Sequence, residues 1–255
     1  MASLKLKNIY KVYPSGVTAV TDFNLDIEDK EFIVFVGPSG CGKSTLIRLI
    51  NGLCPHYFGG QLKGTVRVAG QNNQTLKLHE ISNRVGTLFQ NPESQFFALG
   101  VEEEMAFKPE SRGMHPDKIR DLIAKTSQRF GLNSVLKNTI HELSQGQKQL
   151  ISIARIMLKD PPMLILDEAT SSIDIRTEQR IQRAFEKIMK GKTSFIIAHR
   201  LSTIKNADVI LVMKDGSIIE QGTHDELIAQ RGEYYKLYIS PVSYTHLTLP
   251  TKRIV

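Results

Sequence analysis

Residues 37–45 read GPSGCGKST, which matches the spacing G-x-x-x-x-G-K-[ST]. Glycines let a backbone wrap closely around a polyanion, and successive N–H groups can then point at phosphate oxygens. Lys43 would add a positive charge near the β- and γ-phosphates of a nucleotide, and the Ser44 hydroxyl could ligate Mg²⁺. The predicted phosphate-binding residues are Gly37, Ser39, Gly40, Cys41, Gly42, Lys43, Ser44 and Thr45.

The elements on either side of this loop are the ones that such a site requires. Residues 32–36 form an apolar, β-branched and aromatic run that predicts a buried strand. Apolar residues at helical spacing follow in 46–50, and Asn51-Gly52 ends that pattern. The loop is therefore expected to join a strand to the N-terminus of a helix, where the helix dipole also attracts anions.

Two carboxylates, Asp167 and Glu168, follow a second apolar run at 163–166. Ligands of open α/β sheets bind at the carboxyl ends of the strands. A carboxylate at Asp167 could hold Mg²⁺ through its water shell, and Glu168 could polarise a water molecule against the γ-phosphate.

Two further polar residues end predicted strands. Gln90 follows the strand candidate 84–89 and could orient water or a metal ion, while His199 follows 193–198. His199 could bridge the γ-phosphate and water, although a histidine at a strand end is more often structural.

A second anion site is predicted where Ser144 and Gly146 open a helix. One helix N-terminus already serves the phosphates, so a second, on a separate helical lobe, is most useful if it reaches the nucleotide of another subunit. Tyr13 lies in a turn and could stack on an adenine, or it could simply pack against its own turn.

The composition describes a globular chain of 255 residues with 41% hydrophobic residues and a net charge of +7. The charge suits polyanionic ligands or an anionic membrane face. We see neither an apolar stretch of about 18 residues nor a signal peptide. Two cysteines favour a reducing compartment. Basic residues do not alternate with aromatic ones as in single-strand binders, so we expect no nucleic-acid partner.

Strands and helices alternate along the chain, which predicts an α/β core with a mostly helical insert between Gln90 and Leu150. We expect a loop at 55–60, helices at 101–107 and 118–130 separated by prolines, and a solvated first helical turn at 102–104. The pair Asp215-Gly216 predicts a hairpin, and Thr223 with Glu226 predicts a capping box.

These motifs, in this order, resemble an ATP-binding cassette (ABC) ATPase over about residues 3–239. The phosphate loop resembles the Walker A motif, residues 164–167 the Walker B strand, and 171–174 the D-loop. Residues 143–147 resemble the LSGGQ signature, with Gln145 in place of the first glycine. The resemblance implies single-residue roles: Gln90 as the Q-loop, Glu168 as the catalytic glutamate, His199 as the switch histidine and Tyr13 as the adenine-stacking A-loop.

The family resemblance implies an α/β P-loop NTPase (RecA-like) core with an N-terminal antiparallel β subdomain and an inserted α-helical subdomain. We place the core at 1–89 and 151–239, the helical subdomain at 90–150, and a disordered or artefactual tail at 240–255. The implied cofactors are ATP and Mg²⁺. The implied catalytic residues are Glu168, His199 and Gln90, and the implied metal ligands are Ser44, Gln90 and Asp167. In the family two cassettes sandwich ATP, so Ser144, Gly146 and Gln147 would act on the nucleotide of a second cassette.

The resemblance changes character along the chain. The first 45 residues resemble sugar-importer cassettes, residues 46–140 resemble energy-coupling-factor vitamin importers, and residues 144–238 resemble exporter cassettes. The last residues resemble translated sequencing-adapter text. From these changes and this tail we hypothesise an assembly mosaic or a recombinant gene. The family implies transmembrane permease subunits as partners and a peripheral place on the cytoplasmic face of the membrane. A non-transport ABC ATPase and a non-functional mosaic remain the alternatives.

Overall fold

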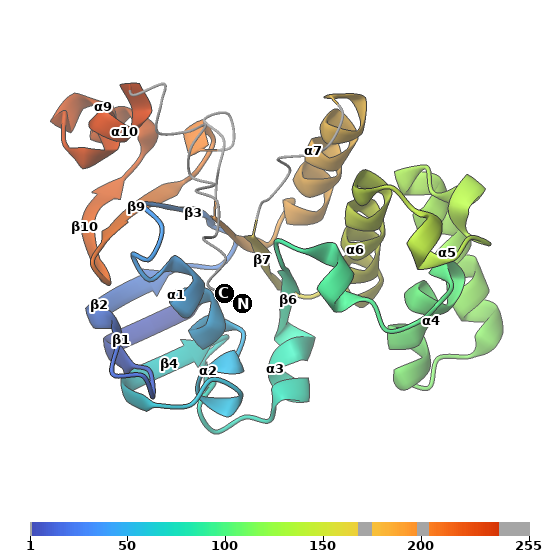
Figure 1. Ribbon diagram of the computed structural model, residues 1–255, viewed down its shortest axis with the longest axis horizontal. Coiled ribbons are helices and arrows are strands. Elements are labelled where there is room, and N and C mark those ends of the chain that lie inside the picture. Colours follow the sequence, from blue (N-terminus) through green and yellow to red (C-terminus); the bar gives the residue numbers. More distant parts are fainter. Residues whose placement is uncertain (1, 168–174, 198–203, 240–255) are drawn as a thin grey trace, which may run out of the picture. The chain divides into compact units, whose positions relative to one another are not determined.

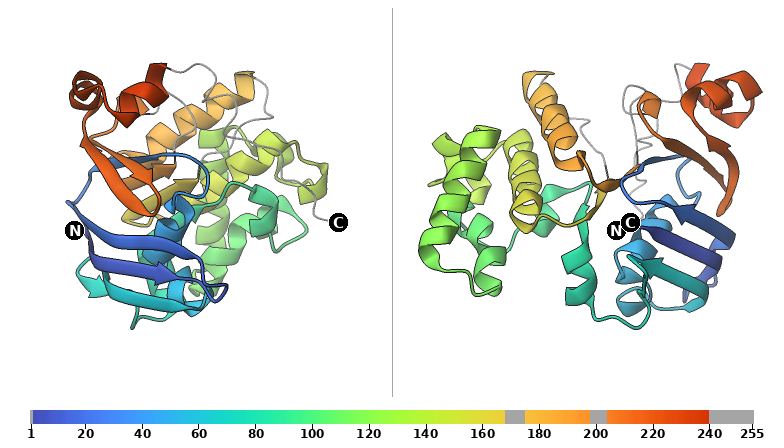
Figure 2. Two further views of the ribbon diagram at one scale, coloured as in Figure 1. Left: turned by 60° about the vertical axis from the view of Figure 1, so that its left-hand side comes forward. Right: turned by 180° about the vertical axis from the view of Figure 1, so that it is seen from behind.

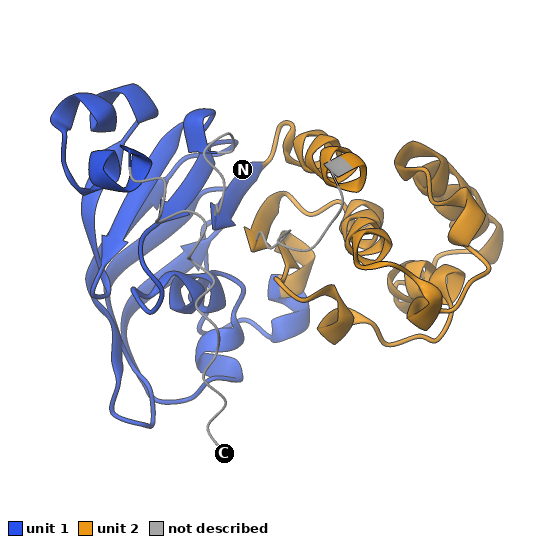
Figure 3. Ribbon diagram, turned by 45° about the horizontal axis from the view of Figure 1, so that its top comes forward, with its two compact units in different colours: residues 1–81, 193–255 blue, residues 82–192 orange. Residues whose placement is uncertain are grey.

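The computed structural model describes residues 2–167, 175–197 and 204–239, which belong to two compact units (Figure 3). The first unit comprises residues 1–81 and 193–255, and the second comprises residues 82–192. This division by packing does not follow the predicted subdomain limits at 89–90 and 150–151, which stay a prediction.

An antiparallel sheet opens the first unit, in the strand order β2-β1-β4-β5 (Figure 2). Its strands are β1 (Leu4–Val12), β2 (Thr18–Ile27), β4 (Gln61–Val68) and β5 (Gln71–Asn72). Leu4 pairs with Ile27 on one side and with Val68 on the other, and all three side chains are buried. Alternation of apolar and polar residues thus gives the sheet one core face and one polar face.

Parallel pairing dominates the second group of strands in this unit. Strand β3 (Phe32–Val36) lies between β8 (Thr193–Ile197) and β9 (Val209–Lys214) and is parallel to both. A tight turn joins β9 to the antiparallel β10 (Ser217–Gly222). Both turn residues, Asp215 and Gly216, have positive φ, as a two-residue hairpin of this kind requires. The predicted hairpin is therefore confirmed.

The described helices of the first unit are α1 (Lys43–Ile50), α2 (Leu53–His56), α9 (His224–Gln230) and α10 (Glu233–Ile239), and α3 (Leu78–Arg84) starts here and runs into the second unit. Helices α1 and α2 lie on one side of the antiparallel sheet, and α9 and α10 lie together near β10 (Figure 1). The predicted capping box is confirmed: the Thr223 hydroxyl accepts the Glu226 N–H, and the Glu226 carboxylate accepts the Thr223 N–H.

The second unit combines two parallel strands with four longer helices. These elements are β6 (Val85–Leu88), α4 (Val101–Ser111), α5 (Pro116–Phe130), α6 (Gln145–Lys159), β7 (Met163–Asp167) and α7 (Ile175–Met189). Helix α6 packs against α4, α5, α7 and β6, so it is the central element of the unit. Most residues of α6 are buried, and they contact both the helices and strand β6. The second unit therefore includes strands as well as helices. The predicted α/β class with an antiparallel N-terminal sheet is present.

Two local predictions were wrong. Helix α4 continues through Pro109, where we expected a break. Pro109 lies near the end of the helix and is buried, so it sacrifices one helical hydrogen bond while its ring packs in the core. The loop was predicted to begin at residue 55, but residues 55 and 56 belong to the single helical turn α2. Asn51 Oδ1 accepts the Leu53 N–H at 3.1 Å at the start of this turn.

The prediction of a solvated acidic turn at 102–104 was wrong for one residue. Glu104 is only 1% exposed, whereas Glu102 and Glu103 are exposed. One Glu104 carboxylate oxygen accepts the backbone N–H groups of Phe97 and Ala98 at 2.8 and 2.7 Å. The other lies 2.9 Å from the Arg155 guanidinium. A buried carboxylate needs such partners, and only the fold could supply them.

Among residues 2–167, 175–197 and 204–239, no helix is both long enough and apolar enough to cross a bilayer.

The ammonium group of Lys159 yields a stability prediction. Burial, with Lys108 and Arg112 nearby, lowers the pKa of Lys159 to about 8 from its usual 10.5. Between these two values the unfolded chain holds this proton more tightly than the folded one, so the free energy of unfolding rises with pH. Relative to Lys159→Met, the wild type should gain on the order of 2 kcal/mol from about pH 7 to about pH 9.5 in urea denaturation. Lys125→Met, at an exposed lysine of α5, should keep the wild-type slope.

Candidate functional site

The phosphate loop joins β3 to α1, as the sequence predicted. Gly37 and Gly42 have φ of +148° and +102°, a region that side chains strongly disfavour. A Cβ at Gly42 would lie 2.6 Å from the Ala19 carbonyl oxygen, and one at Gly37 would clash with the Met213 carbonyl. The chain passes so close to its neighbours that only glycine fits at these two positions.

Lys43 and Ser44 start helix α1, and no side chain caps this helix. The Lys43 ammonium donates to the carbonyl oxygens of Gly37 and Pro38 at 2.6 and 2.8 Å, and it lies 3.2 Å from Cys41 Sγ. Cys41 is buried, while Ser44 is exposed. The lysine is thus held inside the curve of the loop, where a phosphate group would meet it.

Tyr13 lies against the helix that follows the phosphate loop. Its hydroxyl is 3.1 Å from Thr45 Oγ1 and accepts a hydrogen bond of 3.2 Å from Arg48. The ammonium of Lys11 lies 5.1 Å from the centre of the Tyr13 ring. The fold therefore brings Tyr13 to the phosphate loop, whereas the sequence had left a purely local packing role equally open. Its contact with adenine stays a prediction.

Gln90 and Asp167 lie at one edge of the two-stranded ladder in the second unit. Strands β6 and β7 are parallel, and Leu88 pairs with Leu166, so both strands reach their carboxyl ends together. Gln90 lies two residues after Leu88, and Asp167 lies one residue after Leu166. Both residues therefore lie at the carboxyl ends of neighbouring strands, where ligands of open α/β sheets bind, and their role as metal ligands stays a prediction. Ser44, the third predicted Mg²⁺ ligand, belongs to the first unit.

Ser144 caps the N-terminus of α6. Its hydroxyl accepts the Gln147 N–H at 3.3 Å, and the Gln147 side-chain oxygen accepts the Ser144 N–H at 2.9 Å. Ser144 is exposed and Gly146 is buried. A hydroxyl that accepts from the backbone can still donate its proton, so Ser144 remains able to bind an anion. The predicted helix start is confirmed.

The predicted residues Glu168 and His199, and the D-loop at 171–174, lie outside the residues that the structure describes. Their roles stay predictions.

Sequence reasoning missed several residues around these sites. Lys11 is fully buried and donates to the carbonyl oxygen of Gly59 at 2.5 Å, beneath Tyr13. Glu93 contacts Lys148 at 2.5 Å, across 55 positions of the chain. Only the position of Lys148 directly after the signature hinted at a role, since partners so distant in sequence leave no local pattern.

The family model described as ABC transporter matches residues 20–171, which include the phosphate loop, Gln90, the capped start of α6 and Asp167. The chain belongs to the ABC transporter family. The predicted α/β P-loop fold and the identification of an ABC ATP-binding domain are thereby confirmed, whereas the mosaic hypothesis is not.

Three similar ABC proteins are informative. An ABC transporter ATP-binding protein of Methanosarcina mazei is 36% identical over 245 residues, which cover 94% of this chain and 42% of that protein. An ATP-dependent lipid A-core flippase of Syntrophus aciditrophicus is 37% identical over 244 residues (92% and 39%). A third, an ABC transporter ATP-binding protein of Vibrio vulnificus, is 37% identical over 212 residues (82% and 37%).

The chain therefore spans about two fifths of the length of the curated relatives that it matches. Family membership implies nucleotide binding and ATPase chemistry in general.

The roles of the Tyr13 ring and the Tyr13 hydroxyl in ATP binding can be tested separately. Tyr13→Ala should raise the Kd for ATP by about 5- to 150-fold, because stacking on a base is worth about 1–3 kcal/mol. Tyr13→Phe should stay within about threefold of the wild type, since it keeps the ring. Titration with a fluorescent ATP analogue measures both values. Tyr10→Ala, at a partly exposed tyrosine of β1, is the control. Equal losses for Phe and Ala would instead assign the role to the hydroxyl bonds.

Proposed function

We propose that this chain is the ATP-binding and ATP-hydrolysing part of an ABC transporter. The observation that supports the proposal is that a helix begins at each of the two predicted anion sites. One is the glycine loop at the start of α1, and the other is the capped start of α6. A P-loop ATPase working alone would need only the first of these. The pair favours a cassette dimer in which each ATP is held by both kinds of site.

In this mechanism the amides of the phosphate loop and Lys43 bind the phosphates. Ser44, Gln90 and Asp167 would hold Mg²⁺, which neutralises charge on the β- and γ-phosphates. These are a hydroxyl, an amide and a carboxylate, the oxygen donors that Mg²⁺ prefers. Glu168 would act as the base that takes a proton from the attacking water, and His199 would hold the γ-phosphate.

The N-terminus of α6 would act on the nucleotide of the opposite cassette. Ser144 can donate its hydroxyl proton to a γ-phosphate oxygen while it still accepts the Gln147 N–H. Gly146 is buried in the first turn and carries no side chain that could stand between the helix N-terminus and a phosphate. Closure of the dimer would therefore require ATP at both sites.

The partners that we propose are a second cassette and transmembrane permease subunits, at the cytoplasmic face of the membrane. The names of the relatives support transport, since one is an ATP-dependent lipid A-core flippase. Those relatives are more than twice as long as the matched region, so the membrane part can lie in the same polypeptide or in another.

The replacement Glu168→Gln tests the proposed chemistry. An amide cannot take the proton from water but keeps the shape of the side chain, so ATP should still bind while kcat falls by about 100-fold or more. The ATP-bound dimer should then accumulate. Phosphate release measures turnover, and size-exclusion chromatography with light scattering measures the dimer.

Glu186→Gln, at an exposed glutamate of α7, is the matched control and should behave as the wild type. Undiminished turnover in Glu168→Gln would refute the assignment of the base. A wild-type protein that binds ATP but neither dimerises nor hydrolyses it would refute the proposed function and favour a non-functional mosaic.

A further inference from the structure

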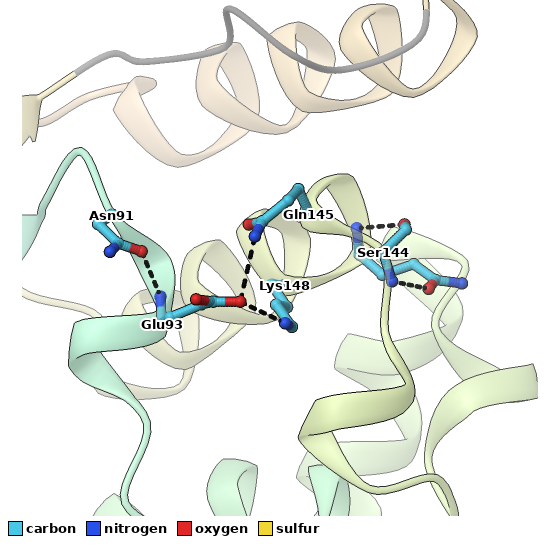
Figure 4. Close-up of polar contacts among 6 residues, drawn as sticks. Asn91, Glu93, Ser144, Gln145 and Lys148 are labelled. Carbon is cyan, nitrogen blue, oxygen red and sulfur yellow. Dashed lines mark hydrogen bonds and ion pairs between the residues drawn. The ribbon is translucent and has the colours of Figure 1, made fainter.

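Glu93 connects the segment after Gln90 to the first turn of α6 (Figure 4). A single carboxylate oxygen of Glu93 accepts two hydrogen bonds, one from the Lys148 ammonium at 2.5 Å and one from the Gln145 amide at 3.1 Å. The Glu93 N–H donates to Asn91 Oδ1 at 2.9 Å. Glu93 is thus fixed at its backbone and reaches α6 with its side chain.

The charges explain why this contact matters. Lys148 lies in the first turn of α6, where the positive end of the helix dipole disfavours a cation. Its side chain is only 10% exposed, and the first turn of α6 contains no acidic residue. Glu93 supplies that missing negative charge from another part of the chain. The Lys148 ammonium, together with Gln145, holds the pKa of the Glu93 carboxyl below its usual range, so this carboxyl is ionised at neutral pH.

A second connection lies further along the same two segments. Arg155, on α6, donates to the carbonyl oxygen of Gln95 at 2.6 Å, and its guanidinium lies 5.8 Å from the centre of the Phe96 ring. Arg155 is also paired with the buried Glu104, which accepts the next two backbone N–H groups. Residues 93–98 are therefore attached to α6 at two places, and Glu93 makes the attachment at its first turn.

Glu93 does not compete with the anion site itself. The side chains of Ser144 and Gln147 are bonded to each other's backbone, and neither bond involves Glu93. Figure 4 shows the Glu93 carboxylate directed at Gln145 and Lys148, while Ser144 and its partner form a separate pair. Glu93 can therefore hold the helix turn without occupying the place of a phosphate.

We propose that Glu93 is a positioning residue for the signature, holding the first turn of α6 so that Ser144 meets the ATP of the second cassette. This inference rests on the proposed dimeric ATPase. Gln145 strengthens the contact, because a glycine at this position could not donate from a side chain to Glu93. Motion of the Gln90 segment would reach Ser144 through this contact.

The test separates binding of ATP by one cassette from closure of two. In the Glu168→Gln background, Glu93→Ala should raise the ATP-dependent dimer Kd by about tenfold, since it leaves a poorly exposed cation at a helix N-terminus. With Glu168 intact, the same replacement should lower kcat by about tenfold. The Kd of the single chain for a fluorescent ATP analogue, measured at concentrations below dimerisation, should stay within about twofold, because the phosphate loop belongs to the first unit.

A charge exchange provides the decisive second measurement. Glu93→Lys and Lys148→Glu should each weaken the dimer by about tenfold, and the double replacement should recover at least about threefold over either single one. Glu102→Ala, at an exposed glutamate of α4, is the matched control.

Two results would overturn the inference. One is additive losses in the double replacement, and the other is an equal loss of single-chain ATP binding, which would indicate general damage. A wild-type chain with no ATP-dependent dimer would instead contradict the proposed function, so the two failures are distinguishable.

Discussion

The unpaired N–H groups at the start of a helix are the physical resource on which both candidate sites depend. Helix α1 has no side-chain cap, so its first amides and Lys43 remain available to phosphates. Helix α6 is capped by Ser144 and Gln147, and its serine keeps one proton to donate. Both candidate sites therefore use the unpaired N–H groups of a helix N-terminus, but the side chains around these groups differ.

Holding these helix ends in place requires contacts from distant parts of the chain. At α1, the loop passes so close to Ala19 and Met213 that glycines are obligatory. At α6, the first turn carries a lysine rather than an acid, and Glu93 compensates it. In both arrangements the local backbone or charge is unfavourable at the helix N-terminus. Contacts with distant parts of the chain compensate this cost.

The contacts of Glu93 also bear on the mosaic hypothesis. Glu93 belongs to the part of the chain that resembles importer cassettes, while Gln145 and Lys148 belong to the part that resembles exporter cassettes. A poor fit between two parents would leave unpaired charges where the segments meet. Glu93 and Lys148 instead pair closely, and Arg155 reaches both Glu104 and the carbonyl of Gln95. These polar matches count against a chain whose parts do not fit.

The sequence by itself determined the elements and the chemistry of the phosphate loop. Glycine spacing, the apolar run of β3, the Asp215-Gly216 turn and the Thr223 capping box act over a few residues, so their meaning can be found locally. Tertiary structure alone decided that Glu104 is buried, that α4 continues through Pro109, and that Tyr13 contacts Thr45. It also decided that Glu93 finds Lys148. Burial and the pairing of charges depend on which segments meet in space. Contacts between residues that are far apart in the sequence leave no local pattern from which they could be predicted.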